Sequence, residues 1–272
     1  MHNLEFFLKK SNQLRLDIFK KFCQVRTGHP GSIFSMLDII VALYYGDYLK
    51  FDKSKNIYDD KVIISKGHAA SCLYPILAEK GVIDKKDWDN WGVSNDTILR
   101  IFGNTSISGI DATSGSLGHG LGIGAGYALS FKKRNIDNKV FVIISEGELY
   151  EGSIWETLMF ANHQNLNNLH LIIDRNNLMI LGDTENCLKL EPIKDKIESF
   201  GFETKEVNGH DYNDLLSTYD NFFLNNKNCN CIIANTIKGK GIKQFENNAK
   251  WHYWNDLSQD DEDKIIQELS IK

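Results

Sequence analysis

The sequence has few of the features that mark secreted, disordered or membrane-embedded chains. Its 272 residues include only three prolines, which argues against a proline-rich linker or a disordered tail. The longest apolar run near the front, Ile39 to Tyr45, is too short to span a bilayer. The N-terminal segment is mixed in charge and lacks the apolar stretch of a secretory signal. These absences predict a cytoplasmic protein with reduced thiols.

Clustered positive charge and a cysteine framework are also missing. Lys and Arg number 31 against 36 Asp and Glu, a net charge of −5, and no long basic stripe is present. A dedicated nucleic-acid binder is therefore not expected. The five cysteines are too few and odd in number for a disulfide framework. Cys229 and Cys231 share one face of a predicted strand without a second pair at zinc spacing, so we expect buried small side chains there rather than metal ligands.

The apolar residues instead follow the alternation of an α/β protein. Helical spacing is found over residues 3–26, 69–80, 84–91, 152–165, 193–200, 212–224 and 259–271, and a helix capped by Ser32 runs to about Lys50. Strands are predicted over residues 61–65, 140–144, 169–174, 203–207 and 231–236, and residues 92–113 read as an ordered loop. This order predicts a mostly parallel twisted sheet with helices on both faces, formed by residues 1–272 as one domain.

A glycine-rich helix ends near Arg134. It carries glycines at 118, 120, 122, 124 and 126, each of which costs up to ~1 kcal/mol against alanine in a helix interior. Such a run indicates that another backbone or a ligand comes very close.

Three predicted strands end in polar residues and glycine, at Ser65–His68, Ser145–Glu148 and Asp174–Asn177. Ligands of open α/β sheets bind beyond these strand ends, and the turn at Gly115–Gly118 opens a helix whose amides suit a phosphate. Glu146 and Asn176 are thirty positions apart, about one strand–helix–strand crossover, so adjacent strand tips can hold both. With a backbone carbonyl and diphosphate oxygens they could complete a Mg²⁺ site. The alternative is a capping acid and an asparagine in a turn.

Taken together, the motifs resemble the N-terminal, diphosphate-binding half of transketolase. The segments that carry the resemblance are Gly28–Gly31, Ser65–His68, Thr113–Gly118, Glu146–Gly152, Asp174–Asn177 and Asn235–Gly241, and their order and spacing match nearly end to end. The resemblance implies the thiamine diphosphate-binding fold, thiamine diphosphate as cofactor, and Mg²⁺ or a similar divalent ion.

The resemblance also implies residue roles. Metal ligands are the side chains of Glu146 and Asn176 and the carbonyl of Leu178; cofactor contacts are His68, Gly115, Ser116, Leu117, Gly147, Glu148, Asn176 and His252; catalytic residues are His29, His68 and His252. Taken singly, each histidine is more often structural, and His252 could simply pack among the aromatics at 251–254. His2, His163, His170 and His210 receive no role. Glu151 matches an interface residue, or is an acid favoured in a first helical turn.

Three departures from the family pattern bear on function. Glu146 stands where the family has Asp, no histidine occurs in Leu99–Gly103 where the family holds its sugar donor, and no pyrimidine-binding domain follows. We therefore expect a chain that is inactive alone and joins a separate C-terminal pyrimidine-binding subunit in an α2β2 assembly. The expected reaction is transfer of a two-carbon ketol unit from a ketose to an aldehyde. The alternatives are decarboxylation and carboligation of a 2-oxo acid, or a non-catalytic scaffold subunit.

Overall fold

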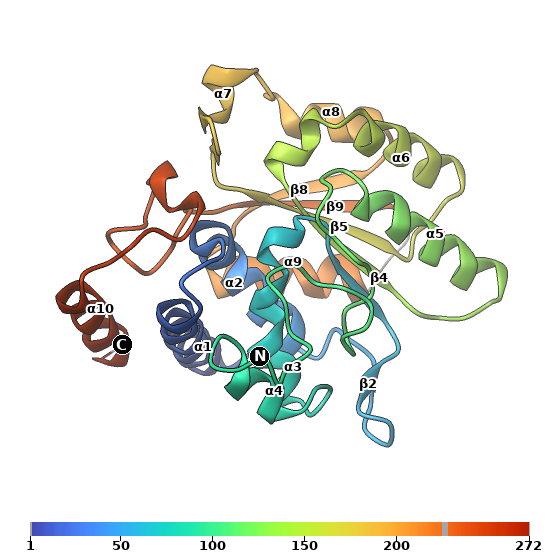
Figure 1. Ribbon diagram of the computed structural model, residues 1–272. Coiled ribbons are helices and arrows are strands. Elements are labelled where there is room, and N and C mark those ends of the chain that lie inside the picture. The colour runs from blue at the N-terminus through green and yellow to red at the C-terminus, as the bar shows by residue number, and fades with distance from the viewer. Residues whose placement is uncertain (1, 225–227, 272) are drawn as a thin grey trace.

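A sheet of five parallel strands forms the centre of the molecule (Figure 1). The computed structural model describes residues 2–224 and 228–271. In spatial order the strands are β3 (Lys61–Ile64), β4 (Val140–Ser145), β5 (Leu169–Arg175), β9 (Asn230–Asn235) and β8 (Glu203–Asn208). Each neighbouring pair is parallel, which confirms the predicted sheet.

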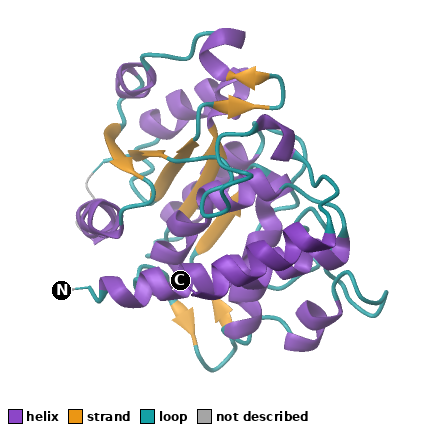
Figure 2. Cartoon of the chain, turned by 90° about the vertical axis from the view of Figure 1, so that its left-hand side faces the viewer, coloured by secondary structure: helices purple, strands orange, loops and turns teal. Residues whose placement is uncertain are grey.

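Helices cover both faces of this sheet (Figures 1 and 2). One face carries α5 (Gly120–Lys133), α6 (Gly152–His163) and α8 (Ile193–Ser199). The opposite side carries α1 (Leu4–Val25), α2 (Pro30–Tyr45), α3 (Leu73–Glu79) and α9 (Tyr212–Leu224), with α10 (Gln259–Ile271) packed on α1. Within residues 2–224 and 228–271, none of the helices combines the length and the apolar character that crossing a membrane requires.

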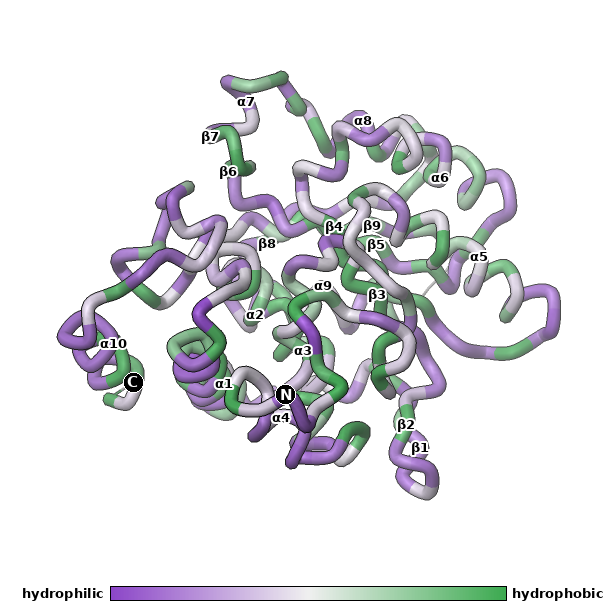
Figure 3. Tube along the Cα trace, in the orientation of Figure 1, coloured by the Kyte–Doolittle hydropathy of each residue, from purple (hydrophilic) through white to green (hydrophobic). Residues whose placement is uncertain are grey.

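The central strands are apolar on both sides because helices cover both sides. In β4, Phe141 and Ile143 join the core beneath α2 and α9, whereas Val142 and Ile144 join the core beneath α5 and α6. The edge strand β8 is less buried, with Thr204 and Val207 buried and its charged residues partly or fully exposed. In Figure 3, apolar segments are gathered in the sheet and polar stretches lie in the outer loops.

Several local boundaries differ from the sequence prediction. The α2 helix begins at Pro30, with His29 at the capping position, so the expectation of a Ser32 cap is wrong. Proline at the first helical position has the required φ and no N–H to satisfy, which favours the earlier start. The helix also ends at Tyr45 rather than near Lys50.

Short elements were not anticipated. They are β1 (Phe51–Asp52), β2 (Ile57–Tyr58), β6 (Leu178–Met179), β7 (Gly182–Asp183), α7 (Thr184–Cys187) and the 3₁₀ turns η1 (Gly67–Cys72), η2 (Glu146–Tyr150) and η3 (Ala249–His252). The short helix α4 (Lys85–Asn90) was anticipated.

The glycines of the α5 segment serve close approach at some positions and not at others. A Cβ on Gly120 would lie 2.4 Å from the Cβ of Ser65, and one on Gly124 would lie 2.4 Å from a methyl of Val142. The predicted close approach is thus confirmed where α5 crosses β3 and β4. Gly126 has no atom within 4 Å of such a Cβ, so packing within this chain does not require glycine there.

Candidate functional site

A cavity of about 310 Å³ opens at the carboxyl edge of the sheet, where sequence reasoning placed the site. Its walls come from the start of α2, the turn after β3, the turn after β4, the segment after β5 and the η3 turn. Of the predicted site residues, it brings together His29, His68, Gly115, Leu117, Glu146, Gly147, Asn176, Leu178 and His252. Three predicted residues, Ser116, Glu148 and Glu151, do not line it.

Three histidines from distant parts of the chain meet in this cavity. The ring centroid of His29 lies 4.9 Å from that of His68 and 5.5 Å from that of His252, and the latter two are 5.6 Å apart. Burial, with a contribution from the nearby Lys238, lowers the pKa of His29 and of His252 to about 4, and burial lowers that of His68 well below its usual value. All three rings are therefore neutral at pH 7 and can exchange hydrogen bonds with hydroxyl groups.

Lys238 fixes the orientation of one of these rings. Its ammonium lies 3.2 Å from Nδ1 of His252 and donates to the Leu178 carbonyl at 3.1 Å. Because an ammonium only donates, Nδ1 of His252 accepts, and the neutral ring then carries its proton on Nε2. Burial and the neighbouring Lys66 lower the pKa of Lys238 to about 8, which leaves the ammonium mostly charged at pH 7.

Lys66 and Lys238 are site residues that the sequence reasoning missed. Both line the cavity, and both are almost fully buried. Lys66 forms an ion pair with Asp174 and donates to the Ser32 carbonyl at 3.1 Å. Lys66 directly follows one predicted strand, Lys238 comes two residues after another, and each stands beside a glycine, which was the available signal.

The predicted metal ligands occupy the tips of two adjacent strands, since Ser145 of β4 pairs with Asp174 of β5. Glu146 is 2% exposed, and its Oε1 has no hydrogen-bond partner. The Asn176 amide oxygen accepts from the backbone N–H of Leu178 at 3.2 Å. A bare carboxylate oxygen beside amide and carbonyl oxygens is a donor set that suits a hard divalent cation. Among the described residues there is no group of three or more His, Cys, Asp or Glu that could hold a metal. A divalent ion here would therefore depend on the carboxylate, amide and carbonyl oxygens together with oxygens of a bound small molecule.

Arg175 holds the other oxygen of Glu146 in an ion pair. The guanidinium also binds the Thr184 hydroxyl at 3.0 Å, Glu191 at 2.9 Å and Glu185 at 3.3 Å. Burial raises the pKa of the Glu146 carboxyl, and Arg175 opposes that shift. One buried cation therefore connects the candidate metal ligand to the segment that carries Met179 and Ile180 along the cavity wall.

Glu148 is fully buried and does not line the cavity. Its carboxylate accepts from the backbone N–H of Ser145 at 2.9 Å and of Gly118 at 3.0 Å, and from the Ser65 hydroxyl. It thereby joins the turns after β3 and β4 to the start of the α5 segment. Direct contact between Glu148 and a cofactor stays a prediction, and the structure gives the side chain a supporting position.

The segment that lacks the family's histidine brings an aromatic ring to the cavity. Phe102 lines its mouth, is 42% exposed, and lies 6.0 Å from His29 between ring centroids. Tyr253 flanks His29 from another side at 4.9 Å. The mouth beside His29 is therefore aromatic, whereas the charged side chains lie at the strand ends.

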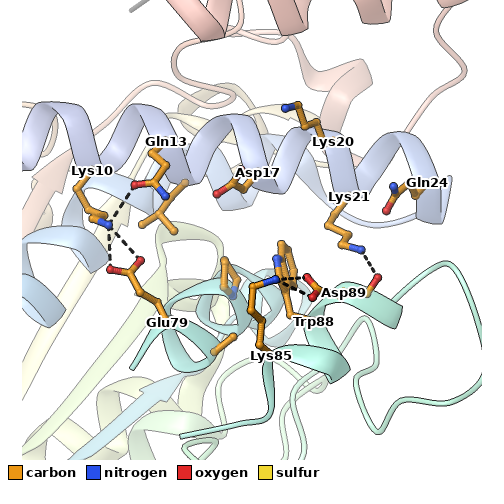
Figure 4. A pocket seen from close by; sticks show the side chains of 13 residues that line it. Lys10, Gln13, Asp17, Lys20, Lys21, Gln24, Glu79, Lys85, Trp88 and Asp89 are labelled. Carbon is orange, nitrogen blue, oxygen red and sulfur yellow. Dashed lines mark hydrogen bonds and ion pairs between the residues drawn. The ribbon is translucent and has the colours of Figure 1, made fainter. Parts of the chain in front are cut away.

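A second, larger hollow of about 710 Å³ lies between α1 and the α3–α4 region (Figure 4). Its charged side chains largely satisfy one another: Lys10 pairs with Glu79 at 2.9 Å and Lys85 with Asp89 at 2.6 Å. Lys21 donates to the Asp89 carbonyl at 2.8 Å. None of its lining residues comes from the strand ends, so we place the functional site at the smaller cavity.

Comparisons with known proteins identify the family to which the chain is similar. The family described as "Transketolase, thiamine diphosphate binding domain" matches residues 8–271. One of the subunits of an apulose-4-phosphate transketolase, from Phocaeicola vulgatus, is 36% identical over 255 residues, covering 93% of this chain and 89% of the relative. The "6-deoxy-6-sulfo-D-fructose transketolase subunit SqwG" of a Clostridium species is 31% identical, with 89% of each chain covered.

Longer proteins match over part of their length. Human "Transketolase" is 30% identical over 262 residues, covering 95% of this chain and 41% of the human protein. The crystal structure of transketolase from Campylobacter jejuni superposes with a TM-score of 0.85 at 25% identity, covering 99% of this chain and 47% of that chain.

Proposed function

The chain belongs to the transketolase family, and from this premise we propose that it is the thiamine diphosphate-binding subunit of a two-chain, transketolase-like enzyme. With Mg²⁺, the enzyme transfers a two-carbon ketol unit from a ketose to an aldehyde. Residues 1–272 form one diphosphate-binding domain, and a pyrimidine-binding domain comes from a separate chain. The coverage supports this division, because relatives named as subunits match over 82–89% of their length and human transketolase over 41%.

The observation that carries the proposal is the composition of the cavity. It combines an unpaired buried carboxylate oxygen on Glu146, the ammonium of Lys238 and three neutral histidines at one edge of the sheet. A diphosphate that shares a divalent cation with the protein needs acceptor oxygens for the metal and donors for its own oxygens. Few other ligands use both kinds of group at the same place.

The residues divide into two sets around such a ligand. Glu146, Asn176 and the Leu178 carbonyl would hold the metal, with Lys238 giving up or sharing the carbonyl that it now contacts. Gly147, Gly115, Ser116 and Leu117 lie on the turns that would contact the cofactor, and His68 and His252 would donate to its diphosphate side. The bound cofactor supplies the electron sink for carbon–carbon bond cleavage, and the protein orients and tunes it.

His29 stands nearest the substrate in this proposal. Its Nδ1 is buried without a hydrogen-bond partner, and its ring contacts both His68 and the aromatic mouth. A neutral imidazole in this position can hydrogen-bond a substrate hydroxyl or carry its proton near pH 7.

The outer surface of α5 and α6 offers a place for self-association. Ile123, Met159 and Phe160 are 39–59% exposed there, and Glu151 is exposed at the start of α6 without a capping hydrogen bond. We assign this surface to the contact between two copies, which gives the α2β2 assembly with two pyrimidine-binding chains. The interface role of Glu151 and a cytoplasmic location stay predictions.

A second candidate reaction is favoured by Phe102. Its ring offers no hydrogen bond to a donor hydroxyl beside His29, which suits a transferred unit that carries a methyl group. The candidate is decarboxylation of a 2-oxo acid followed by addition of the remaining acyl unit to an aldehyde.

The test is reconstitution. The chain is co-expressed with a pyrimidine-domain partner, and turnover of ketose phosphates, hydroxypyruvate and pyruvate is measured with and without thiamine diphosphate and Mg²⁺. We expect cofactor-dependent transfer by the pair and none by either chain alone. Glu146→Gln keeps the shape but not the charge and should weaken metal-dependent cofactor binding, whereas exposed Glu198→Gln should not. A purified complex that binds no cofactor with Mg²⁺ present would overturn the proposal.

A further inference from the structure

Lys238 lies on a segment, residues 236–241, that is held at almost every position after β9. The Thr236 hydroxyl donates to Asp174, the Gly239 N–H donates to the Gly31 carbonyl at 3.0 Å, and the Lys238 carbonyl accepts from Asn247 at 2.9 Å. The backbone N–H of Ile237, next to Lys238, donates to a side chain: it lies 2.8 Å from Nε2 of His210.

This contact determines how the His210 ring is protonated. A backbone N–H can only donate, so Nε2 of His210 must present its lone pair. The neutral ring then carries its proton on Nδ1, which lies 2.7 Å from a carboxylate oxygen of Asp38 in α2. The ring therefore forms a bridge between a helix of the core and the peptide that precedes Lys238.

The far end of the bridge is held by further contacts. Asp38 is buried and binds Arg15 of α1 at 3.1 Å and the Tyr212 hydroxyl at 3.2 Å. Burial raises the pKa of Asp38, but Arg15 and His210 outweigh burial and lower it to about 2, so the group is a carboxylate at pH 7. Arg15 also packs under the segment, since a Cβ on Gly241 would lie 2.5 Å from its side chain.

We propose that His210, oriented by Asp38, is a positioning residue that fixes Lys238 against the diphosphate of the cofactor. The inference rests on the proposed function for the identity of the ligand, and it gives a role to a histidine to which the sequence assigned none. The Lys238 ammonium reaches both the Leu178 carbonyl and His252 within 3.2 Å. Displacing the adjoining peptide by about 1 Å would break these contacts, and errors of this size can cost on the order of a hundredfold in catalysis.

Two variants of His210 separate positioning from simple structural support. His210→Gln places an amide oxygen near the former Nε2 and can still accept from Ile237. His210→Asn places an amide nitrogen near the former Nδ1, so it can donate to Asp38 but cannot reach Ile237. We expect thiamine diphosphate to bind about tenfold more weakly to the reconstituted His210→Asn complex, with the His210→Gln complex close to the unmodified one.

A double-mutant cycle tests whether the effect passes through Lys238. Lys238→Met should weaken cofactor binding by itself, and adding His210→Asn should weaken it no further. Additive losses, or equal affinities for the Asn and Gln variants, overturn the inference. A purely structural role predicts that both His210 variants lose stability in urea while cofactor affinity stays unchanged.

A readout without cofactor keeps this test separate from the proposed function. Lys238 is 2% exposed, so an amine-acylating reagent should label it slowly in the full chain. Mass spectrometry should show faster labelling of Lys238 in His210→Asn than in His210→Gln, with exposed Lys243 as the internal reference. If the unmodified complex binds no cofactor, the proposed function fails, and equal labelling of Lys238 in both variants still overturns the positioning role.

Discussion

Replacing Arg175 by methionine should destabilise the metal-free chain by about 3–5 kcal/mol, the usual cost of breaking a buried ion pair by removing one partner. The substitution leaves the Glu146 carboxylate 2% exposed without its cation, because Arg175 is the cation that this carboxylate contacts among the described residues. The lost contacts with Glu185 and Glu191 lie nearer the surface and add about 0–1 kcal/mol each. Urea unfolding followed by tryptophan fluorescence measures the difference.

Added Mg²⁺ should stabilise this variant more than it stabilises the unmodified chain. A metal ion and the Arg175 guanidinium are both cations directed at Glu146, so removing one favours the other. A ligand at a hundred times its dissociation constant contributes about 2.7 kcal/mol to the free energy of unfolding. The gap between the variant and the unmodified chain should therefore narrow as Mg²⁺ is titrated.

Two controls define what the result means. Lys85→Met removes the surface pair with Asp89 and should cost no more than about 0.5 kcal/mol. The double variant Arg175→Met, Glu146→Leu replaces the pair by apolar groups, should recover most of the lost stability, and should not respond to Mg²⁺. A loss under 1 kcal/mol in the single variant, or equal Mg²⁺ responses in the single and double variants, would refute this account of the site.

Three further predictions concern the cavity and its support. Burial lowers the pKa values of the cavity histidines, so the unfolded chain takes up protons before the folded chain as pH drops. The free energy of unfolding should therefore fall between about pH 6.5 and pH 4, by up to about 1.4 kcal/mol per pH unit for each histidine. Urea titrations of His68→Gln should show a pH dependence that is smaller by the contribution of one histidine. Gly120→Ala, whose Cβ would meet Ser65, should lower the free energy of unfolding by about 1–3 kcal/mol, whereas Gly126→Ala should raise it by about 0.5–1 kcal/mol. Equal shifts of the two melting temperatures would contradict the packing described. Phe102→His should raise the ratio of kcat/KM for hydroxypyruvate over pyruvate by about fivefold in the reconstituted complex, since one new hydrogen bond is worth about 1 kcal/mol. An unchanged ratio would remove Phe102 from donor selection.

The fold was largely predictable because its signals are local. Unbroken apolar runs such as Val140–Ile144 mark strands that are covered on both faces, and helical spacing between them leaves a parallel sheet as the natural arrangement. The ends of elements were less predictable, since they depend on single residues. Pro30 started α2 before Ser32 could cap it, and the residues after Gly67 formed a 3₁₀ turn before α3.

The candidate site, like the fold, could be predicted from the sequence only in part. Residues beside strand ends, such as His68 and Glu146, could be located because topology brings strand ends together. Glu148 and His210 could not be placed from sequence, because what they do depends on partners far along the chain. Glu148 accepts from Gly118, thirty positions away, and His210 binds Asp38 across 172 positions.

The charges around the cavity would allow this mildly acidic chain to hold the anionic cofactor that we propose for it. Asp174 neutralises Lys66 and Arg175 neutralises Glu146, each within a buried pair, and the histidines are uncharged at pH 7. Lys238 is then the cation of the described lining that no carboxylate pairs with, since its ammonium contacts a carbonyl and an imidazole. A diphosphate retains negative charge after one divalent ion binds, and a single ammonium is the complement that such a ligand needs. On this argument Lys238→Met should weaken binding of the magnesium–diphosphate unit, whereas Lys66→Met should chiefly destabilise the fold through Asp174.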